Sequence, residues 1–184
     1  SMSRAVYSGA HVGSLNPVFQ VTRREYNSPN DYDKVDLTAI DGNYRVRIKY
    51  QPGNIDEFNN KIPCTSWGKK VTEEYRLINR EMVGCSSERT LIASIVAPRI
   101  THVNTLFSIS MKDIFSLVVL AGCEASVPFD FFVKTIGKGH INVSTTMLFP
   151  ILKSKVNAEI IQRTLLLNCL TEDYSPLWNQ FMSE

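Results

Sequence analysis

Eight cationic side chains stand at predicted turns and strand ends, where they could contact a charged ligand. They form four neighbouring pairs: Arg23 and Arg24, Lys69 and Lys70, Arg99 and His102, and Lys138 and His140. Basic side chains on loops, with asparagine and serine between them, suit contacts to DNA phosphates and base edges. The eight residues are therefore candidate DNA contacts, with solvated or acid-paired surface cations as the alternative.

The stretch from Ser86 to Thr105 carries cations at both exits of an apolar run, Leu91 to Ala97. Arg89 directly precedes the run and is as well placed for a structural pairing with Glu81 or Glu88 as for DNA. Arg99 and His102 follow Pro98 in a predicted loop, which favours them as DNA contacts. They are expected to share one concave face with Lys138, His140 and loops from the first seventy residues.

Several enzymatic signatures are absent from the sequence. There is no glycine-rich loop of the dinucleotide-binding or P-loop type and no G-x-S-x-G nucleophile motif. The three histidines, His11, His102 and His140, are too far apart in sequence to indicate a local metal site. Asp56 and Glu57 lie in a predicted loop with no strand before it, so they do not suggest a nuclease site.

The chain of 184 residues is 43% hydrophobic and 21% charged, which suits one folded domain. Its net charge of +2 is too small to identify a nucleic-acid binder by itself. Four scattered cysteines without a C-x-x-C pair predict reduced thiols in the cytoplasm. No apolar run approaches the roughly 20 residues of a membrane span. Residues 1–2 are expected to be an expression scar, and residues 3–184 a single domain cut from a longer protein.

The first half of the chain predicts strands separated by loops. A short strand is expected near Val18 to Thr22, and a half-buried strand at Asn43 to Tyr50, where apolar and basic residues alternate. Glu74 to Met82 and Arg89 to Pro98 resemble a hairpin, and the second strand, apolar on both faces, is expected to be central in the sheet. Residues 51–63 are expected to form a loop, residues 65–70 a glycine-centred turn, and residues 104–110 a further short strand.

The second half predicts helices. Asp113 can cap a helix with its apolar residues at helical spacing, and Pro128 is expected in the first turn of a second helix that Gly137 ends. A short strand or bridge at residues 140–144 and an extended segment at 145–153 precede a terminal helix that begins near Asn157. The fold class is therefore α+β, with a mixed β-sheet scaffold, a helical hairpin and a C-terminal helix.

The order of several motifs resembles the target-recognition region of large adenine-specific DNA methyltransferases of restriction–modification and phage-exclusion systems. The motifs are YRLINREM (75–82), ERTLIASIVAP (88–98), HVNTLFSI (102–109), SVPFDFFVKTIG (126–137) and LFPIL (148–152). They extend over residues 75–170, about half the chain, and SRAVYSGAHVGSLNPVFQ (3–20) also resembles the start of such a region. LFPIL lacks the second proline that the family's pattern carries.

The resemblance implies a module that recognises a double-stranded DNA site beside a methyltransferase domain of the same parent chain. The catalytic motifs of the family, a glycine-rich cofactor loop and an Asn/Asp-Pro-Pro-aromatic tetrapeptide, are missing, and NSPND (27–31) matches the tetrapeptide only in part. S-adenosylmethionine is therefore expected only in a separate catalytic domain, and no enzymatic activity is expected of this chain alone.

Two alternatives to DNA recognition stay open. One is a structural or protein-interaction domain that packs on a partner subunit, which would show an exposed apolar surface. The other is a fragment of a nuclease whose site assembles from distant residues, which would show clustered acids or a metal site. DNA recognition instead requires a basic cleft without catalytic carboxylates.

Overall fold

The computed structural model describes residues 5–84 and 86–182. At its centre lies a three-stranded antiparallel sheet with the order β5-β4-β7. Its strands are β4 (Arg76–Arg80), β5 (Ala93–Val96) and β7 (Leu106–Ile109). β4 pairs with both neighbours, so that Ile78 lies between Ser94 on β5 and Ser108 on β7. The predicted hairpin pairing and the strand after it are confirmed, but the connection runs over residues 81–92 and is longer than the predicted loop of a few residues.

β5 is an edge strand in this sheet, so the prediction that it is central was wrong. The side chain of Asn168 occupies the open edge: its Oδ1 accepts a hydrogen bond from the Ile95 amide at 2.8 Å, and its Nδ2 donates to the Ile95 carbonyl at 2.9 Å. The Leu15 amide donates to the Ala93 carbonyl at 2.8 Å. The edge is thus buried by a helix and a loop, which explains why β5 is apolar on both faces without being central.

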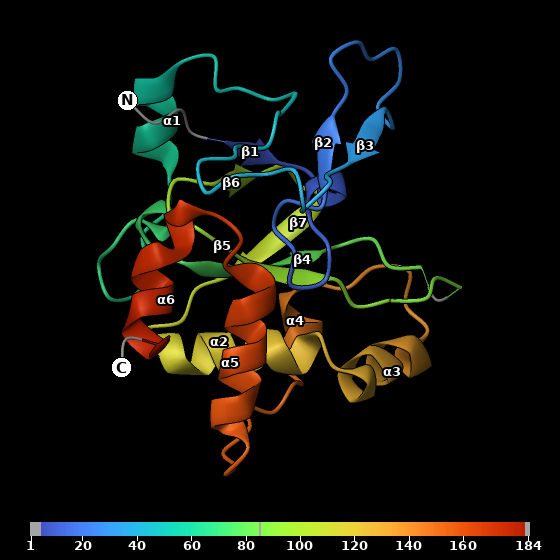
Figure 1. Ribbon diagram of the computed structural model, residues 1–184, viewed down its shortest axis with the longest axis vertical. Helices are drawn as coiled ribbons and strands as arrows, with labels where there is room; N and C mark the ends of the chain where they lie inside the picture. Colours follow the sequence, from blue (N-terminus) through green and yellow to red (C-terminus); the bar gives the residue numbers. More distant parts are fainter. Residues whose placement is uncertain (1–4, 85, 183–184) are drawn as a thin grey trace.

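Helices cover one face of the sheet, below it in Figure 1. They are α2 (Ile114–Glu124), α3 (Val127–Ile136), α4 (Val143–Thr146), α5 (Asn157–Asn168) and α6 (Ser175–Met182), with a 3₁₀ turn, η3 (Glu172–Tyr174), before α6. As predicted, the Asp113 carboxylate caps α2, Pro128 lies in the first turn of α3, and Gly137 ends α3 with a φ of 68°. α2 and α3 meet at an angle of 69°.

α2 and α5 pack closely because of Gly122. A Cβ at this position would come within 2.3 Å of the Thr164 Oγ1 atom and 2.6 Å of the Ile160 side chain. Only glycine permits this approach. The predicted extended segment at 145–153 is partly wrong, because α4 includes Thr145 and Thr146, with Asn142 capping its first turn.

The opposite face carries a layer of loops and short elements, above the sheet in Figure 1. The strands are β1 (Val6–Tyr7), parallel to β6 (Thr101–His102), and β2 (Gln20–Thr22), antiparallel to β3 (Tyr32–Lys34). The helical elements are η1 (Gly9–His11), α1 (Ile55–Lys61) and η2 (Val71–Glu73). This is the loop-rich layer, residues 5–73 with β6.

Two predictions for the loop-rich layer were wrong. Asn43 to Tyr50 forms no strand. Of the residues in this segment, only Tyr50 makes a β-bridge within the described chain, with Val6. Its alternation persists because Val46 is buried between two exposed arginines, Arg45 and Arg47. The expected loop at 51–63 contains α1, whose first turn is capped by the Asn54 side chain accepting from two backbone amides at 3.1 Å.

The two layers have separate apolar clusters on opposite sides of β4. Leu77 faces the larger cluster, formed with the helices, and Ile78 faces a smaller one, formed with Tyr7, Val12 and other residues of the loop-rich layer. Arg89 donates from Nη2 to the Ala125 carbonyl at the end of α2, at 2.6 Å, and has no ion pair with any described acid. Arg89 therefore connects the hairpin to the end of α2 through a carbonyl, and it pairs with neither Glu81 nor Glu88.

Candidate nucleic-acid interface

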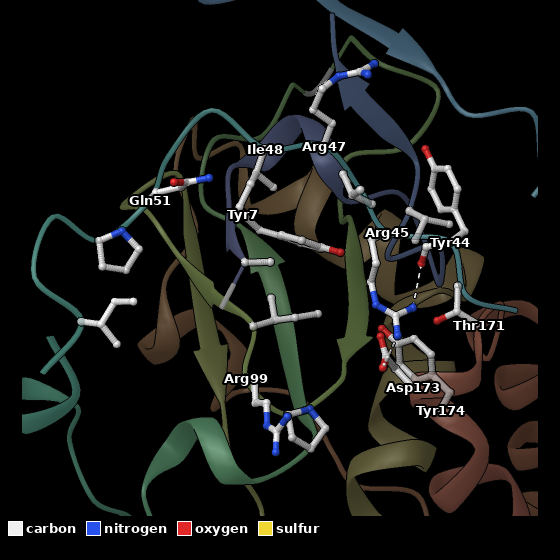
Figure 2. Close-up of a pocket in the computed structure, with 17 residues that line it drawn as sticks. Tyr7, Tyr44, Arg45, Arg47, Ile48, Gln51, Arg99, Thr171, Asp173 and Tyr174 are labelled. Atoms are coloured by element: carbon white, nitrogen blue, oxygen red, sulfur yellow. Dashed lines mark hydrogen bonds and ion pairs between the residues drawn. The ribbon is translucent and has the colours of Figure 1, made fainter. Parts of the chain in front are cut away.

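A cleft of about 790 Å³ opens between the loop-rich layer, the exit of β5 and the segment before α6. We call it the arginine cleft, after Arg45, Arg47 and Arg99 at its border. Figure 2 shows the Tyr7 ring across the middle of the cleft and the three arginines arranged around it. The cleft thus combines cations with an aromatic and aliphatic floor.

The floor of the arginine cleft comes from residues far apart in sequence. Tyr7 and Tyr174 are 5% and 2% exposed, and Val46 and Ile100 lie beside them. Burial raises the pKa of the Tyr7 hydroxyl far above its usual value, so this group stays neutral and can donate a hydrogen bond. The floor is therefore uncharged, and the charge of the cleft lies at its border.

The three arginines differ in what holds them. Arg45 donates from Nη2 to the Asp173 carboxylate at 2.9 Å, an ion pair marked in Figure 2. Arg47 donates from Nε to the Thr22 carbonyl at 2.7 Å and extends away from Tyr7. Asp173 is the one acid among the described residues that line the cleft, and it is already paired. The cleft is therefore basic and has no free carboxylate among its described lining residues.

Arg99 has an unusual backbone. Its φ of 72° lies in the left-handed region that non-glycine residues rarely adopt, and its amide donates to the Thr72 carbonyl at 2.7 Å. The strained conformation turns the chain sharply after β5 and places an exposed arginine at the border of the cleft. Backbone strain of this kind costs on the order of 1–3 kcal/mol and occurs often at functional sites.

The structure separates the four residues that were expected on one face. Arg99 lines the arginine cleft and His102 a neighbouring pocket, both near the end of the sheet where β4 begins and β5 ends. His140 forms a bridge with Met82, beyond the other end of β4, and Lys138 is nearby in the chain. Residues 76 and 82 are separated by about 20 Å of extended chain. Lys138 and His140 therefore do not share a concave face with Arg99.

The other predicted contacts lie at the surface of the loop-rich layer. Arg23 donates from Nε to the Asp33 carboxylate at 2.8 Å, while Arg24 is exposed beside it. Lys69 is paired with Glu74 at 3.2 Å, and Lys70 donates to the Asn59 carbonyl at 2.9 Å. Of these four, only Arg24 lacks a protein partner within the described residues. None of them lines the arginine cleft.

Sequence reasoning did not single out Arg45 and Arg47 as contacts of a cleft. The available signal was their alternation with Tyr44, Val46 and Ile48, which correctly placed the arginines on the exposed side. The partner segments of the cleft, β1 and the residues before α6, are more than a hundred positions apart. No local pattern indicates that they meet.

Neither a metal site nor a membrane span emerges from the described residues. No group of three or more His, Cys, Asp or Glu side chains among them is arranged to hold a metal ion. None of their helices by itself has the length and apolar composition needed to cross a membrane. Cys64, Cys123 and Cys169 are free thiols, and Cys85 lies outside the described residues.

Comparisons of the chain with protein-family models, with curated protein sequences and with solved structures gave no match.

Proposed function

We propose that the chain is a DNA-recognition module of a restriction–modification or phage-exclusion adenine methyltransferase, without catalytic activity of its own. The observation that carries the proposal is the arginine cleft, where exposed Arg47 and Arg99 have no carboxylate partner among the described residues. Arginine can bind phosphates and the edges of guanine with two hydrogen bonds. The order of motifs along residues 75–170 supports the same function and the cytoplasmic location that it implies.

The composition of the cleft fits DNA recognition better than catalysis. Among the described lining residues, the one acid is paired with Arg45, so none of them offers a free carboxylate to act as a base or to bind a metal. S-adenosylmethionine would bind in a separate methyltransferase domain of the parent chain. The module would supply contacts to the DNA backbone and bases, and the catalytic domain the methyl transfer.

The test is fluorescence anisotropy with labelled duplex DNA over a series of salt concentrations. Arg47→Ala and Arg99→Ala should each weaken binding, and loss of one phosphate contact should reduce the salt slope by about 1. Arg163→Ala is the matched control, because Arg163 on α5 is also exposed but does not line the cleft. This variant should bind DNA as the unsubstituted chain does. Lys138→Ala tests whether the DNA also reaches the far end of the sheet.

Two results would exclude this cleft as a DNA-binding surface. One is the absence of detectable DNA binding by the unsubstituted chain. The other is binding that neither Arg47→Ala nor Arg99→Ala changes and that does not depend on salt. If a substitution that weakens binding does so for only one DNA sequence, the arginine reads a base, with an expected cost of about 1–3 kcal/mol.

A second candidate function is docking on a partner domain through α3 and α4. Large apolar side chains are exposed there: Val127 is 70% exposed, Phe131 64%, Met147 79% and Leu148 65%. Met147 and Leu148 directly follow α4, and the neighbouring Phe149 contacts Phe129 and Phe132 of α3, so these segments pack together. Exposed apolar side chains that gather on one surface are typical of interaction sites. Amide hydrogen exchange of the chain, alone and within its longer parent, tests this function: protection of α3 and α4 in the parent is expected if they dock.

A further inference from the structure

A second, smaller pocket of about 330 Å³ lies beside α1, at the end of the sheet where β4 begins. We call it the Arg76 pocket. Its nitrogen groups belong to Arg76, Lys61 and His102, and its hydroxyl groups to Thr72, Thr101 and Ser108. The remaining lining residues are apolar: Phe58, Ile62, Pro63 and Val71. No acidic residue is among the described residues that line it.

Arg76 is the most deeply placed group of the pocket, with only 2% of its surface exposed. Its Nη2 donates to the Ile100 carbonyl, and its Nη1 is 3.4 Å from the Ser108 Oγ. Its Nε is buried and has no hydrogen-bond partner. No described carboxylate forms an ion pair with the guanidinium.

A buried guanidinium without a counter-charge is costly, because burial removes the water that stabilises its charge. Burial lowers the pKa of Arg76 to about 10, which still leaves the group protonated at neutral pH. The carbonyl of Ile100 satisfies one N–H but supplies no net negative charge. The pocket therefore contains a full positive charge that the described part of the chain does not neutralise.

Several of the polar groups around Arg76 can donate hydrogen bonds. The hydroxyls of Thr72 and Ser108 can each donate, and Lys61 lies exposed at the rim, where its ammonium group is paired with Glu57 at 2.6 Å. The Nδ1 atom of His102 donates to the Val103 carbonyl at 3.1 Å, and burial lowers the pKa of the ring, so Nε2 of the neutral ring is an acceptor that can receive the proton of a hydrogen-phosphate group. A ligand with several negatively charged oxygens would satisfy such a set.

We propose that the Arg76 pocket is an anion-binding site that takes a phosphate group. The planar guanidinium, with an unused Nε–H, matches two oxygens of a tetrahedral oxyanion, and the hydroxyls match the others. The apolar wall formed by α1 and the residues after it allows the phosphate to carry an organic group. The proposal does not depend on DNA binding by the arginine cleft, since the two sites have no lining residue in common.

Isothermal titration calorimetry with inorganic phosphate, at an ionic strength held constant with sodium chloride, tests the proposal. One saturable site is expected, and Arg76→Gln should weaken it by about tenfold or more because a charge-assisted contact is lost. Arg80→Gln is the matched control. Arg80 lies on the same face of the same strand as Arg76 but does not line the pocket. The Arg80→Gln variant should therefore bind phosphate as the unsubstituted chain does.

A second pair of variants keeps the test decisive if Arg76→Gln does not fold, as judged by circular dichroism. Ser108→Ala and His102→Ala remove pocket-lining groups that are less buried, and the double variant should weaken phosphate binding by about tenfold. Duplex DNA added to the phosphate complex distinguishes the two sources of the ligand. Displacement by DNA identifies a phosphate of the DNA backbone, and no displacement identifies a free phosphate compound.

Three results would overturn the proposal. The first is the absence of saturable phosphate binding below about 10 mM, an affinity too weak for a dedicated site. The second is binding that is unchanged in Arg76→Gln or, where that variant does not fold, in the Ser108→Ala/His102→Ala double variant. The third is binding that Arg80→Gln weakens to the same extent, which would show a general response to positive charge.

Discussion

The two faces of β4 carry ionisable groups of opposite sign, an acid on the helical face and two bases on the loop-rich face. On the helical face, Glu124 is fully buried with no cation beside it, and the Asn79 amide is the polar group that faces it. On the loop-rich face, Arg76 is buried and Arg80 is partly buried, and no described carboxylate is paired with either. One strand therefore separates an unpaired acid from two unpaired bases.

The difference between the faces follows from the chemistry of the groups. A buried carboxyl can become neutral, and burial raises the pKa of Glu124 to about 8. A guanidinium remains charged in a protein, so Arg76 and Arg80 need acceptors instead. Arg80 donates to the Val12 carbonyl at 2.5 Å and lies against the Phe19 ring, whereas Arg76 faces a pocket. The helical face can therefore neutralise its buried group by protonation, whereas the loop-rich face keeps its charge and is where an anionic ligand can act.

The largest expected difference concerns packing on the two faces. Leu77→Ala removes a fully buried side chain from the larger cluster and should lower the free energy of unfolding by about 3–5 kcal/mol. Ile78→Ala, in the smaller cluster of the other face, should cost about 2–3 kcal/mol because the loops can relax around the cavity. Urea denaturation measures both, and a larger loss for Ile78→Ala would contradict the comparison.

The next effect is the pH dependence that Glu124 confers. Its pKa is raised from 4.5 to about 8, so the folded state binds the proton more tightly than the unfolded state. The free energy of unfolding should therefore fall as the pH rises from about 5 to 8, by on the order of 2–4 kcal/mol from this group.

Glu124→Gln is neutral at every pH and should remove that fall. Urea denaturation at pH 5, 6.5 and 8 checks this expectation. Glu159→Gln, an exposed position on α5, serves as the control and should keep the slope of the parent protein. An unchanged slope in Glu124→Gln would show that the buried carboxyl does not titrate in this range.

The loop-rich face should respond to pH in the opposite direction through His11. This ring is fully buried, and its Nδ1 accepts from the Ser8 amide at 2.9 Å. Burial lowers its pKa from 6.5 to about 4, so the unfolded state binds the proton more tightly. The free energy of unfolding should fall by about 2 kcal/mol as the pH drops from 6.5 to 4. In His11→Gln this fall should be much smaller in denaturation curves at those pH values.

The smallest expected effect separates the two arginines of the loop-rich face. In buffer without phosphate, Arg80→Gln should destabilise the protein by about 1 kcal/mol more than Arg76→Gln. Each variant loses a contact to a carbonyl, but Arg80→Gln also loses an aromatic contact, whereas Arg76→Gln removes a buried charge that no described residue neutralises. Adding phosphate should stabilise the unsubstituted chain and the Arg80→Gln variant but not the Arg76→Gln variant. Thermal unfolding of the three proteins with and without phosphate measures these differences, and equal stabilisation of both variants would remove the distinction between the arginines.

The sequence by itself determined the elements whose signals are local. The hairpin of β4 and β5, the Asp113 cap, the proline at the start of α3 and the glycine at its end all follow from patterns within a few residues of each other. These features depend on backbone geometry and short-range hydrogen bonding, which act wherever the residues stand in the fold. The α+β class follows from the same elements.

Only the tertiary structure decided how the edge of β5 is covered, which extended segment becomes a strand, and where the cations meet. Asn43 to Tyr50 has the alternation of a strand but, within the described chain, makes only isolated backbone contacts to other segments, at Thr22 and Val6, and Asn168 occupies a strand edge from more than seventy residues away. Contacts between distant segments place Arg45 and Arg99 at the same cleft and leave Lys138 near the other end of β4. Such contacts depend on which surfaces are buried together, and no periodicity in the sequence records them.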